Sequence, residues 1–309
     1  MSETLYEISA YAKINLFLKI LGKLPNGYHQ LYTIMQEVDL ADEITVAVDE
    51  EAEDTITVQD PEGKILSEDN LCHIAARKFL GYMGRKYEGT VFPKITITLE
   101  KNIPAQSGMG GGSSDAAAVL LVLQEHFGKP FTDEELNGLA VSIGADVPFF
   151  LYGGTCLCEN VGEEITVLRS LAGGNIVLVK PSEGVSTAEC FKMADRSVAG
   201  EDQIAPFRDI TERLRSGSEE CGLPEFVEFL GNCQDSSNDL QGPAEEMVPE
   251  ISALLSELTA NGARVARMTG SGSAVFGIFD DEEDQASAYD NIRRAHEKDG
   301  TEVYRLKTI

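Results

Sequence analysis

The stretch from residue 104 to residue 123 reads PAQSGMGGGSSDAAAVLLVL and joins a glycine-rich loop directly to a strongly helical segment. Glycine lets the backbone approach an anion closely and adopts positive φ without steric cost. The start of a helix adds unpaired N–H groups and a partial positive charge. The sequence therefore predicts a phosphate-binding loop that opens onto a helix.

This loop matches neither of the two commonest phosphate-binding patterns. It lacks the G-x-x-x-x-G-K-[ST] pattern, and Ser113 stands where the third glycine of G-x-G-x-x-G belongs. For the loop considered alone, the alternative is a flexible loop or a tight helix–strand junction that binds no ligand. We expect Ser113 or Ser114 to cap the helix and to turn a hydroxyl toward a bound phosphate.

The composition limits what the chain can bind. Its 309 residues are enough for a substantial core and for two domains, which we expect at residues 1–160 and 161–309. The net charge of −27 argues against broad binding to nucleic acid or to anionic membranes, although a nucleotide pocket needs only a few local cations. With no signal pattern and no long apolar run, we expect a cytoplasmic protein.

The cysteines indicate neither a disulfide framework nor a zinc site. No Cys-x-x-Cys pair is present, and disulfide frameworks are typical of small secreted chains. We expect reduced and mostly buried thiols at all six positions, which are Cys72, Cys156, Cys158, Cys190, Cys221 and Cys233.

Hydrophobic periodicity predicts a chain that mixes strands and helices without a Rossmann repeat. Strands are expected at 5–20, 30–48, 93–99, 153–157, 175–179, on both sides of a glycine turn in 264–279, and in the closing EVYRLKTI. Helices are expected at 70–80, after the glycine loop, from a capping box at Thr132 and Glu135 to Gly144, at 250–258 and at 282–297. The acidic segment from about 195 to 245 is expected to be irregular, with two short helices.

The glycine loop resembles the second motif of the GHMP kinases, a family named for galactokinase, homoserine kinase, mevalonate kinase and phosphomevalonate kinase. The third motif of that family is a glycine-rich turn between strands, and Met268–Ala274 (MTGSGSA) matches it. The resemblance implies an α+β fold of two domains. The N-terminal domain would bind ATP and contain a left-handed βαβ unit, and the C-terminal domain would be ferredoxin-like and bind the substrate.

Three further stretches resemble one branch of this family, whose substrate is a cytidine-diphosphate derivative of methylerythritol. They are AYAKINLFLKILGKLPNGYHQL at 10–31, GADVPFF at 144–150 and SSNDL at 236–240. The resemblance implies an ATP-dependent kinase that phosphorylates the 2-hydroxyl of this substrate in the non-mevalonate route to isoprenoid precursors. The alternatives are another GHMP kinase, acting on homoserine or mevalonate, and a catalytically silent ligand sensor on the same fold.

Two charged residues in apolar surroundings are the catalytic candidates. Lys13 lies in an apolar strand, where a lysine is costly unless it is paired. Asp146 follows a helix C-terminus, where a solvated aspartate is disfavoured. The resemblance makes Asp146 the general base or hydroxyl-orienting group, and Lys13 its partner and the stabiliser of the transferred charge. Phosphoryl transfer depends mainly on such positioning and charge stabilisation.

Further candidate ATP-binding residues lie in and near the loop. By resemblance Asn70 would lie on the adenine side, and the alternative is that it caps the helix it begins. Lys101 lies just upstream of the loop and is expected to reach the phosphates, and the alternative is a surface lysine. The loop residues expected to surround the triphosphate are Pro104, Ala105, Gln106, Ser107, Gly108, Met109, Gly110, Gly111, Gly112, Ser113 and Ser114.

For the substrate, Tyr28 and His29 follow a turn at Pro25–Gly27, and by resemblance they recognise the cytosine through stacking and hydrogen bonding. A turn aromatic packed on its own domain is the alternative for this pair. Phe191 is expected to supply the other stacking face. Asn15, which shares a strand face with Lys13, is expected to contact the substrate.

Magnesium is expected to enter with ATP and to be held largely by phosphates and water, because the sequence offers no cluster of dedicated acidic ligands. Ser114 is the candidate protein ligand. Asp115, where some family members have Asn, puts a negative charge close to the triphosphate unless its side chain faces away or assists the metal. The expected partners are small molecules, and the chain is expected to be a monomer or a homodimer.

Overall fold

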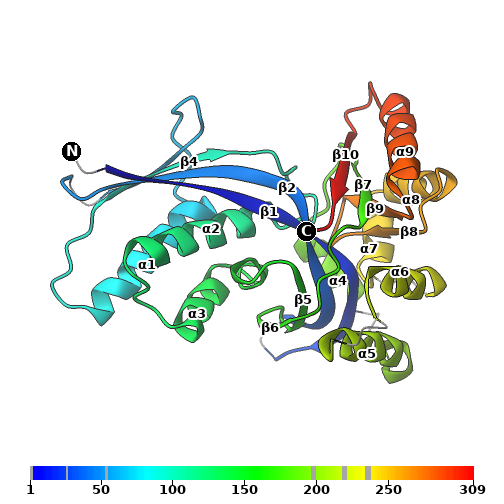
Figure 1. Ribbon diagram of the computed structural model, residues 1–309, viewed down its shortest axis with the longest axis horizontal. Helices are drawn as coiled ribbons and strands as arrows, with labels where there is room; N and C mark the ends of the chain where they lie inside the picture. The colour runs from blue at the N-terminus through cyan, green and yellow to red at the C-terminus, as the bar shows by residue number, and fades with distance from the viewer. Residues whose placement is uncertain (1–2, 26, 53–54, 196–199, 218–220, 234–237) are drawn as a thin grey trace. The chain divides into compact units, whose positions relative to one another are not determined.

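The computed structural model describes residues 3–25, 27–52, 55–195, 200–217, 221–233 and 238–309 (Figure 1). The chain divides into two compact units, each assembled from three stretches. Unit 1 comprises Met1–Ala12, Leu40–Ile103 and Gly110–Tyr152, and unit 2 comprises Lys13–Asp39, Pro104–Met109 and Gly153–Ile309. The two long strands β1 (Glu3–Lys23) and β2 (His29–Asp49) therefore contribute residues to both units.

Unit 1 contains a βαβ element with further helices. Strand β3 (Ile56–Gln59) leads through α1 (Leu71–Lys86) to β4 (Lys94–Glu100), which lies parallel to β3 and antiparallel to the second half of β2. Alternate residues of β4 and of the second half of β2 are buried, as expected for strands with one face against a core. Helix α1 packs against α2 (Gly111–His126), and α3 (Asp133–Ile143) packs against both helices (Figure 1).

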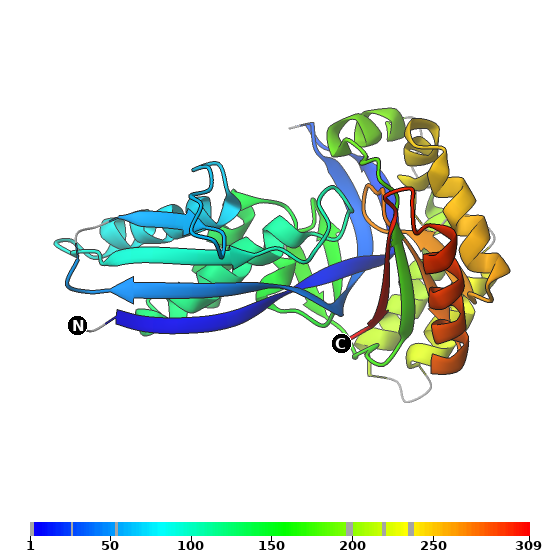
Figure 2. The same cartoon turned by 90° about the horizontal axis from the view of Figure 1, so that it is seen from above.

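Unit 2 is built on a four-stranded antiparallel sheet. The strands β7 (Asn175–Lys180), β8 (Val265–Met268), β9 (Val275–Phe279) and β10 (Glu302–Lys307) follow the order β10-β7-β9-β8. Helices α8 (Glu250–Ala260) and α9 (Glu282–Ala295) cover one face of this sheet (Figure 2). The core between helices and sheet is aliphatic and includes Val177, Val275, Leu254 and Ile292.

The remaining elements connect these parts. The first half of β2 pairs with β5 (Thr155–Asn160), which pairs with β6 (Glu164–Val167). A short 3-10 helix, η1 (Phe149–Leu151), precedes them. The described residues between β7 and α8 form the helices α4 (Thr187–Ala194), α5 (Glu201–Arg215), α6 (Leu223–Asn232) and α7 (Gln241–Met247).

The mixed α+β fold expected from the sequence is confirmed. The capping box at the start of α3 is also present, because Thr132 Oγ1 accepts from the N–H of Glu135 and the Glu135 carboxylate accepts from the N–H of Thr132. The expectation of two short helices between 195 and 245 was wrong, since α6 and the 15-residue α5 lie there and α7 begins there. Buried Ile204, Phe207 and Ile210 recur at helical spacing in α5, a pattern obscured by the many charged residues between them.

Candidate active site

The glycine loop enters helix α2 through a left-handed residue. Gly110 is the N-cap with φ of 74°, and no side chain caps the helix. The expected cap at Ser113 or Ser114 was therefore wrong, because the helix begins earlier, at Gly111, and both serines lie within its first turn. The Ser114 hydroxyl instead donates a hydrogen bond of 2.7 Å to the carbonyl oxygen of Tyr11.

Within unit 2, the loop packs backbone to backbone against the glycine turn Met268–Ala274. The N–H groups of Ser273 and Ala274 donate to the carbonyl oxygens of Gln106 and Ser107, both at 3.2 Å. Gly108 has φ of 77°, and a Cβ there would lie 2.2 Å from the carbonyl oxygen of Thr269. The sequence predicted both glycine motifs but not that they pack against each other at a position open only to glycine.

Lys13 is buried beside the glycine loop and contacts this loop directly. Its Nζ donates to the carbonyl oxygen of Gly108 at 2.7 Å and to Asn15 Oδ1 at 2.6 Å, and its N–H donates to the carbonyl oxygen of Met109. These oxygens compensate for the loss of water around a buried ammonium. The structure thus brings Lys13, Asn15 and the glycine loop together.

A polar network supports Asn15 and the glycine turn. Asn15 Nδ2 donates to Thr33 Oγ1 at 2.9 Å, and the N–H of Asn15 donates to Thr269 Oγ1 at 3.0 Å. Asn238, from the SSNDL stretch, donates from Nδ2 to the carbonyl oxygens of Met268 and Gly270. Sequence reasoning missed Thr33 and Thr269. The only signal for Thr269 was its place inside the third motif, and nothing in the sequence pointed to Thr33.

Asp146 lies in unit 1, in the half-buried turn between α3 and η1. The turn begins at Gly144, which ends α3 in an extended conformation, and a Cβ on Gly144 would lie 3.9 Å from Ser113 Oγ. The Asp146 turn is therefore close to the first turn of α2. Lys13 belongs to unit 2, and its pairing with Asp146 stays a prediction.

Lys101 lies in unit 1 between two carboxylates. Its Nζ contacts Asp42 Oδ2 and lies 2.7 Å from Asp115 Oδ2. Burial raises the pKa of Asp115 to about 7; the charge of Lys101 opposes this rise and Asp42 adds to it. The orientation of Asp115, open in the sequence, is thereby defined, since it faces Lys101. Contact between Lys101 and a phosphate stays a prediction.

Asn70 caps helix α1, which was the alternative role expected for it from the sequence. Its Oδ1 accepts a hydrogen bond of 2.9 Å from the N–H of Cys72. A contact between Asn70 and adenine stays a prediction.

The residues predicted to recognise cytosine lie in unit 2. The His29 ring stacks on Phe191 with centroids 5.0 Å apart and planes 26° apart, while Tyr28 is exposed. His29 Nε2 lies 2.6 Å from Asp195 Oδ1, and Lys23 Nζ donates to Asp195 Oδ2 at 2.6 Å. The hydrogen bonds from Lys23 and His29 lower the pKa of Asp195. Sequence reasoning missed Asp195, which follows Phe191 by one helical turn.

Two other expectations concern cysteines and metals. All six cysteines are free and five of them are buried, as predicted.

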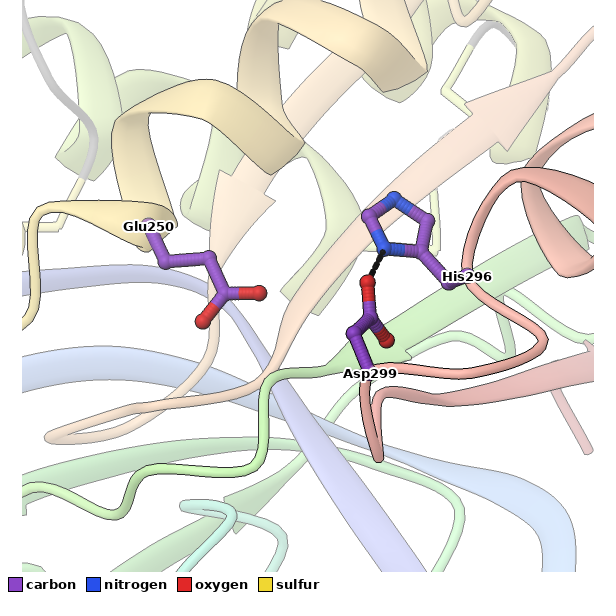
Figure 3. Close-up of side chains that lie close together, drawn as sticks. All are labelled: Glu250, His296 and Asp299. Atoms are coloured by element: carbon purple, nitrogen blue, oxygen red, sulfur yellow. Dashed lines mark hydrogen bonds and ion pairs between the residues drawn. The ribbon is translucent and has the colours of Figure 1, made fainter.

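Glu250, His296 and Asp299 lie close enough to share a cation (Figure 3). However, His296 Nδ1 is 2.7 Å from Asp299 and Nε2 is 2.7 Å from Glu257. An imidazole that donates from both nitrogens has no lone pair left for a metal, so this cluster is best explained as a protonated histidine between carboxylates.

Within the described part of the chain, none of the helices combines the length and the apolar character needed to cross a membrane.

Two family models match segments of the chain that contain the glycine loop and the glycine turn. The model described as GHMP kinases N terminal domain matches residues 70–154, and the model described as GHMP kinases C terminal matches residues 222–298. They lie on either side of the boundary expected near residue 160, which itself stays a prediction.

Similarity to individual proteins points to one kind of kinase within this family. The chain is 41% identical to a 4-diphosphocytidyl-2-C-methyl-D-erythritol kinase of Desulfitobacterium hafniense, over 90% of this chain and 88% of that protein. It is 39% identical to the kinase of the same name from Caldicellulosiruptor saccharolyticus, over 93% and 92% of the two chains.

Solved structures agree with these relatives. A crystal structure of 4-(cytidine 5'-diphospho)-2C-methyl-D-erythritol kinase aligns with a TM-score of 0.71 and 31% identity, covering 98% of this chain and all of that one. A homoserine kinase from Cytophaga hutchinsonii aligns with a TM-score of 0.72 at 18% identity, covering 99% and 97% of the chains, and this likeness supports the fold alone.

Proposed function

The chain belongs to the GHMP kinases and, within them, to the 4-diphosphocytidyl-2-C-methyl-D-erythritol kinases, and on this premise we propose how its residues carry out the reaction. It transfers a phosphoryl group from ATP to the 2-hydroxyl of 4-diphosphocytidyl-2-C-methyl-D-erythritol, a step in isoprenoid precursor synthesis. The observation that carries the proposal is the hydrogen bond between the Lys13 ammonium and the glycine loop.

The glycine loop holds the phosphates of ATP. Loop residues 104–110 run into the start of α2, where the first N–H groups of a helix have no partner within the helix. Left-handed Gly108 and Gly110 let the backbone curve around an anion without a side chain in the way.

Mg²⁺ accompanies the nucleotide, and Ser114 is the residue that fits it. The Ser114 hydroxyl gives its hydrogen to the carbonyl of Tyr11, which leaves its oxygen lone pairs available to a cation. The bound ion would neutralise phosphate charge.

Lys13 and Asp146 have different roles in the reaction. Asn15 Oδ1 and the carbonyl oxygen of Gly108 fix the Lys13 ammonium beside the phosphate loop, where it stabilises the negative charge on the transferred group. Asp146 orients the attacking hydroxyl and accepts its proton. Asn15 serves the reaction by positioning Lys13, and a contact with the substrate remains part of the proposal.

Tyr28, His29 and Phe191 select the cytosine. Exposed Tyr28 offers a ring for stacking, and Phe191 already stacks on His29 with the ring planes 26° apart. Asp195 fixes the orientation of the His29 ring through Nε2, which leaves Nδ1 for hydrogen bonding to the base.

An ADP-release assay tests this function with three acceptors supplied separately: the cytidyl substrate, homoserine and mevalonate. Turnover is expected with the cytidyl substrate alone. Turnover with either of the other two and none with the first would assign the chain to another GHMP activity. ATP binding without turnover on any acceptor would favour the silent sensor.

A further inference from the structure

A buried carboxylate fastens the residues that lead into the glycine loop. Asp42, fully buried in β2, accepts through Oδ1 from the N–H groups of Asn102 at 2.6 Å and Ile103 at 2.8 Å. These two residues immediately precede the loop. A single side chain from a distant part of the sequence thus fixes the direction in which the chain enters the loop.

The exit of the loop is connected to the same carboxylate. Lys101 joins Asp42 to Asp115, which lies on α2 just after the loop. A Cβ on Gly111 would lie 3.0 Å from Ile103 Cγ2 and 3.4 Å from Asp42 Oδ2, so the two ends of the loop are in contact there. All these residues belong to unit 1.

This cluster of charges would be costly in folding free energy if its only role were to stabilise the fold. Two buried carboxylates share one ammonium, and Asp115 Oδ1 is buried without a hydrogen-bond partner. Buried ion pairs contribute little net stability compared with well-packed apolar side chains. The buried Cys72 thiol of α1 is also influenced by Asp115, and burial raises the pKa of this thiol, so it supplies no compensating charge. The cluster therefore calls for another role.

We propose that Asp42 and Lys101 are positioning residues that hold the two ends of the glycine loop together and so preset it for the phosphates of ATP. The inference rests on the proposed function, since it takes the loop as the ATP site. In this role Lys101 acts through Asp42 and Asp115, whereas the sequence suggested that it reaches the phosphates itself.

The two roles of Lys101 make opposite predictions for a double variant. Lys101→Met leaves Asp42 and Asp115 facing each other without the ammonium that opposes the rise in the Asp115 pKa, and at an alkaline pH, where both carboxylates are ionised, their repulsion spreads the ends of the loop. Adding Asp115→Asn removes one of the two charges. If Lys101 is a positioning residue, the second substitution restores much of what the first loses. If Lys101 binds phosphate, the second substitution restores nothing.

Calorimetry in the presence of Mg²⁺ measures the dissociation constant of the complex between the protein and a non-hydrolysable ATP analogue. Steady-state kinetics gives the KM values for ATP and for the acceptor. Lys101→Met is expected to weaken analogue binding by about tenfold and to leave the acceptor KM within about twofold, because misplacing a phosphate site affects one substrate. Asp42→Asn is expected to act in the same direction. The Lys101→Met/Asp115→Asn protein is expected to bind within about threefold of the parent.

Lys86→Met is the matched control, because it removes a lysine that pairs with Glu135 elsewhere in unit 1 and should leave binding unchanged. A lower melting temperature of Lys101→Met with unchanged binding would show a merely structural cluster and overturn the inference. Equal losses in the single and double variants would also overturn it. Failure of the unaltered protein to bind the analogue would instead contradict the proposed function.

Discussion

The Nζ atom of Lys13 lies 2.7 Å from the carbonyl oxygen of Gly108, so a buried cation from the first strand is bound to the glycine loop that we propose holds phosphate. The contact joins residues 95 positions apart in the sequence. It also explains why a lysine is retained in the apolar run AKINLFL, where an unpaired ammonium would be costly.

Replacing Lys13 by Met should abolish most of the activity without unfolding the protein. Methionine keeps the length of the side chain and removes the charge that we propose stabilises the transferred phosphoryl group. We expect kcat to fall by about 10³-fold. Steady-state kinetics measures the loss and circular dichroism checks the fold. A variant that keeps more than about a third of the activity would contradict the assignment, because a charge-stabilising group is worth far more.

Asp146→Asn tests the hydroxyl-orienting role. The amide keeps the shape of the side chain but cannot accept the proton, so kcat should fall by about 10²–10⁴-fold while the KM for ATP changes little. Asp133→Asn, in the exposed first turn of α3, is the matched control and should keep full activity. A comparable loss in both variants would point to a general effect on unit 1.

Gly108→Ala tests the close approach of the two glycine motifs. The new Cβ would meet the carbonyl oxygen of Thr269 at 2.2 Å, so the loop must move and the KM for ATP should rise. Gly128→Ala is the control, because Gly128 also has positive φ, at 71°, but no atom lies within 4 Å of its Cβ position. The control should lose about 1 kcal/mol of unfolding free energy and retain its KM.

Phe191→Ala tests the cytosine site. Removing the ring that stacks on His29 should raise the KM for the cytidyl substrate by about tenfold, in line with the energy of an aromatic pair, and should leave the KM for ATP unchanged. Initial rates measured against each substrate in turn separate the two constants. An increase confined to ATP would place Phe191 outside the cytosine site.

The His296 cluster should make stability depend on pH. Burial lowers the pKa of His296, but the hydrogen bonds to Glu257 and Asp299 outweigh it and raise the pKa above 6.5. The stabilisation is therefore fully present below about pH 6.5, the unfolded value, and is lost as the pH rises through the higher folded pKa. Urea unfolding of the protein and of His296→Gln should differ more at pH 6 than at pH 9. An equal difference at both pH values would contradict the protonated cluster.

Much of the fold was predictable because local patterns determined it. The strict alternation of PKITITL predicted β4, and the capping box predicted the start of α3. The serine cap of α2 failed because left-handed Gly110 starts the helix before either serine. Helix α5 is longer than the short helices expected in this segment because tertiary burial of Ile204 and Phe207 outweighs its polar composition.

The candidate site was predictable only where a residue stood out in its own segment. Lys13 stood out as a charged residue in an apolar strand, and the glycine loop stood out as a run of glycines that opens onto a helix. Thr33, Asp42 and Asp195 did not, because their roles come from contacts with residues more than a hundred positions away or from strands brought together by the sheet. No local pattern in the sequence records such contacts.

The most direct test follows the phosphorus atom itself. ³¹P NMR of a reaction containing ATP and 4-diphosphocytidyl-2-C-methyl-D-erythritol should show a new phosphomonoester on the 2-hydroxyl of the acceptor, and the Lys13→Met protein should form almost none. ATP consumption that yields only inorganic phosphate, or a phosphomonoester formed on homoserine or mevalonate but not on the cytidyl substrate, would contradict the account.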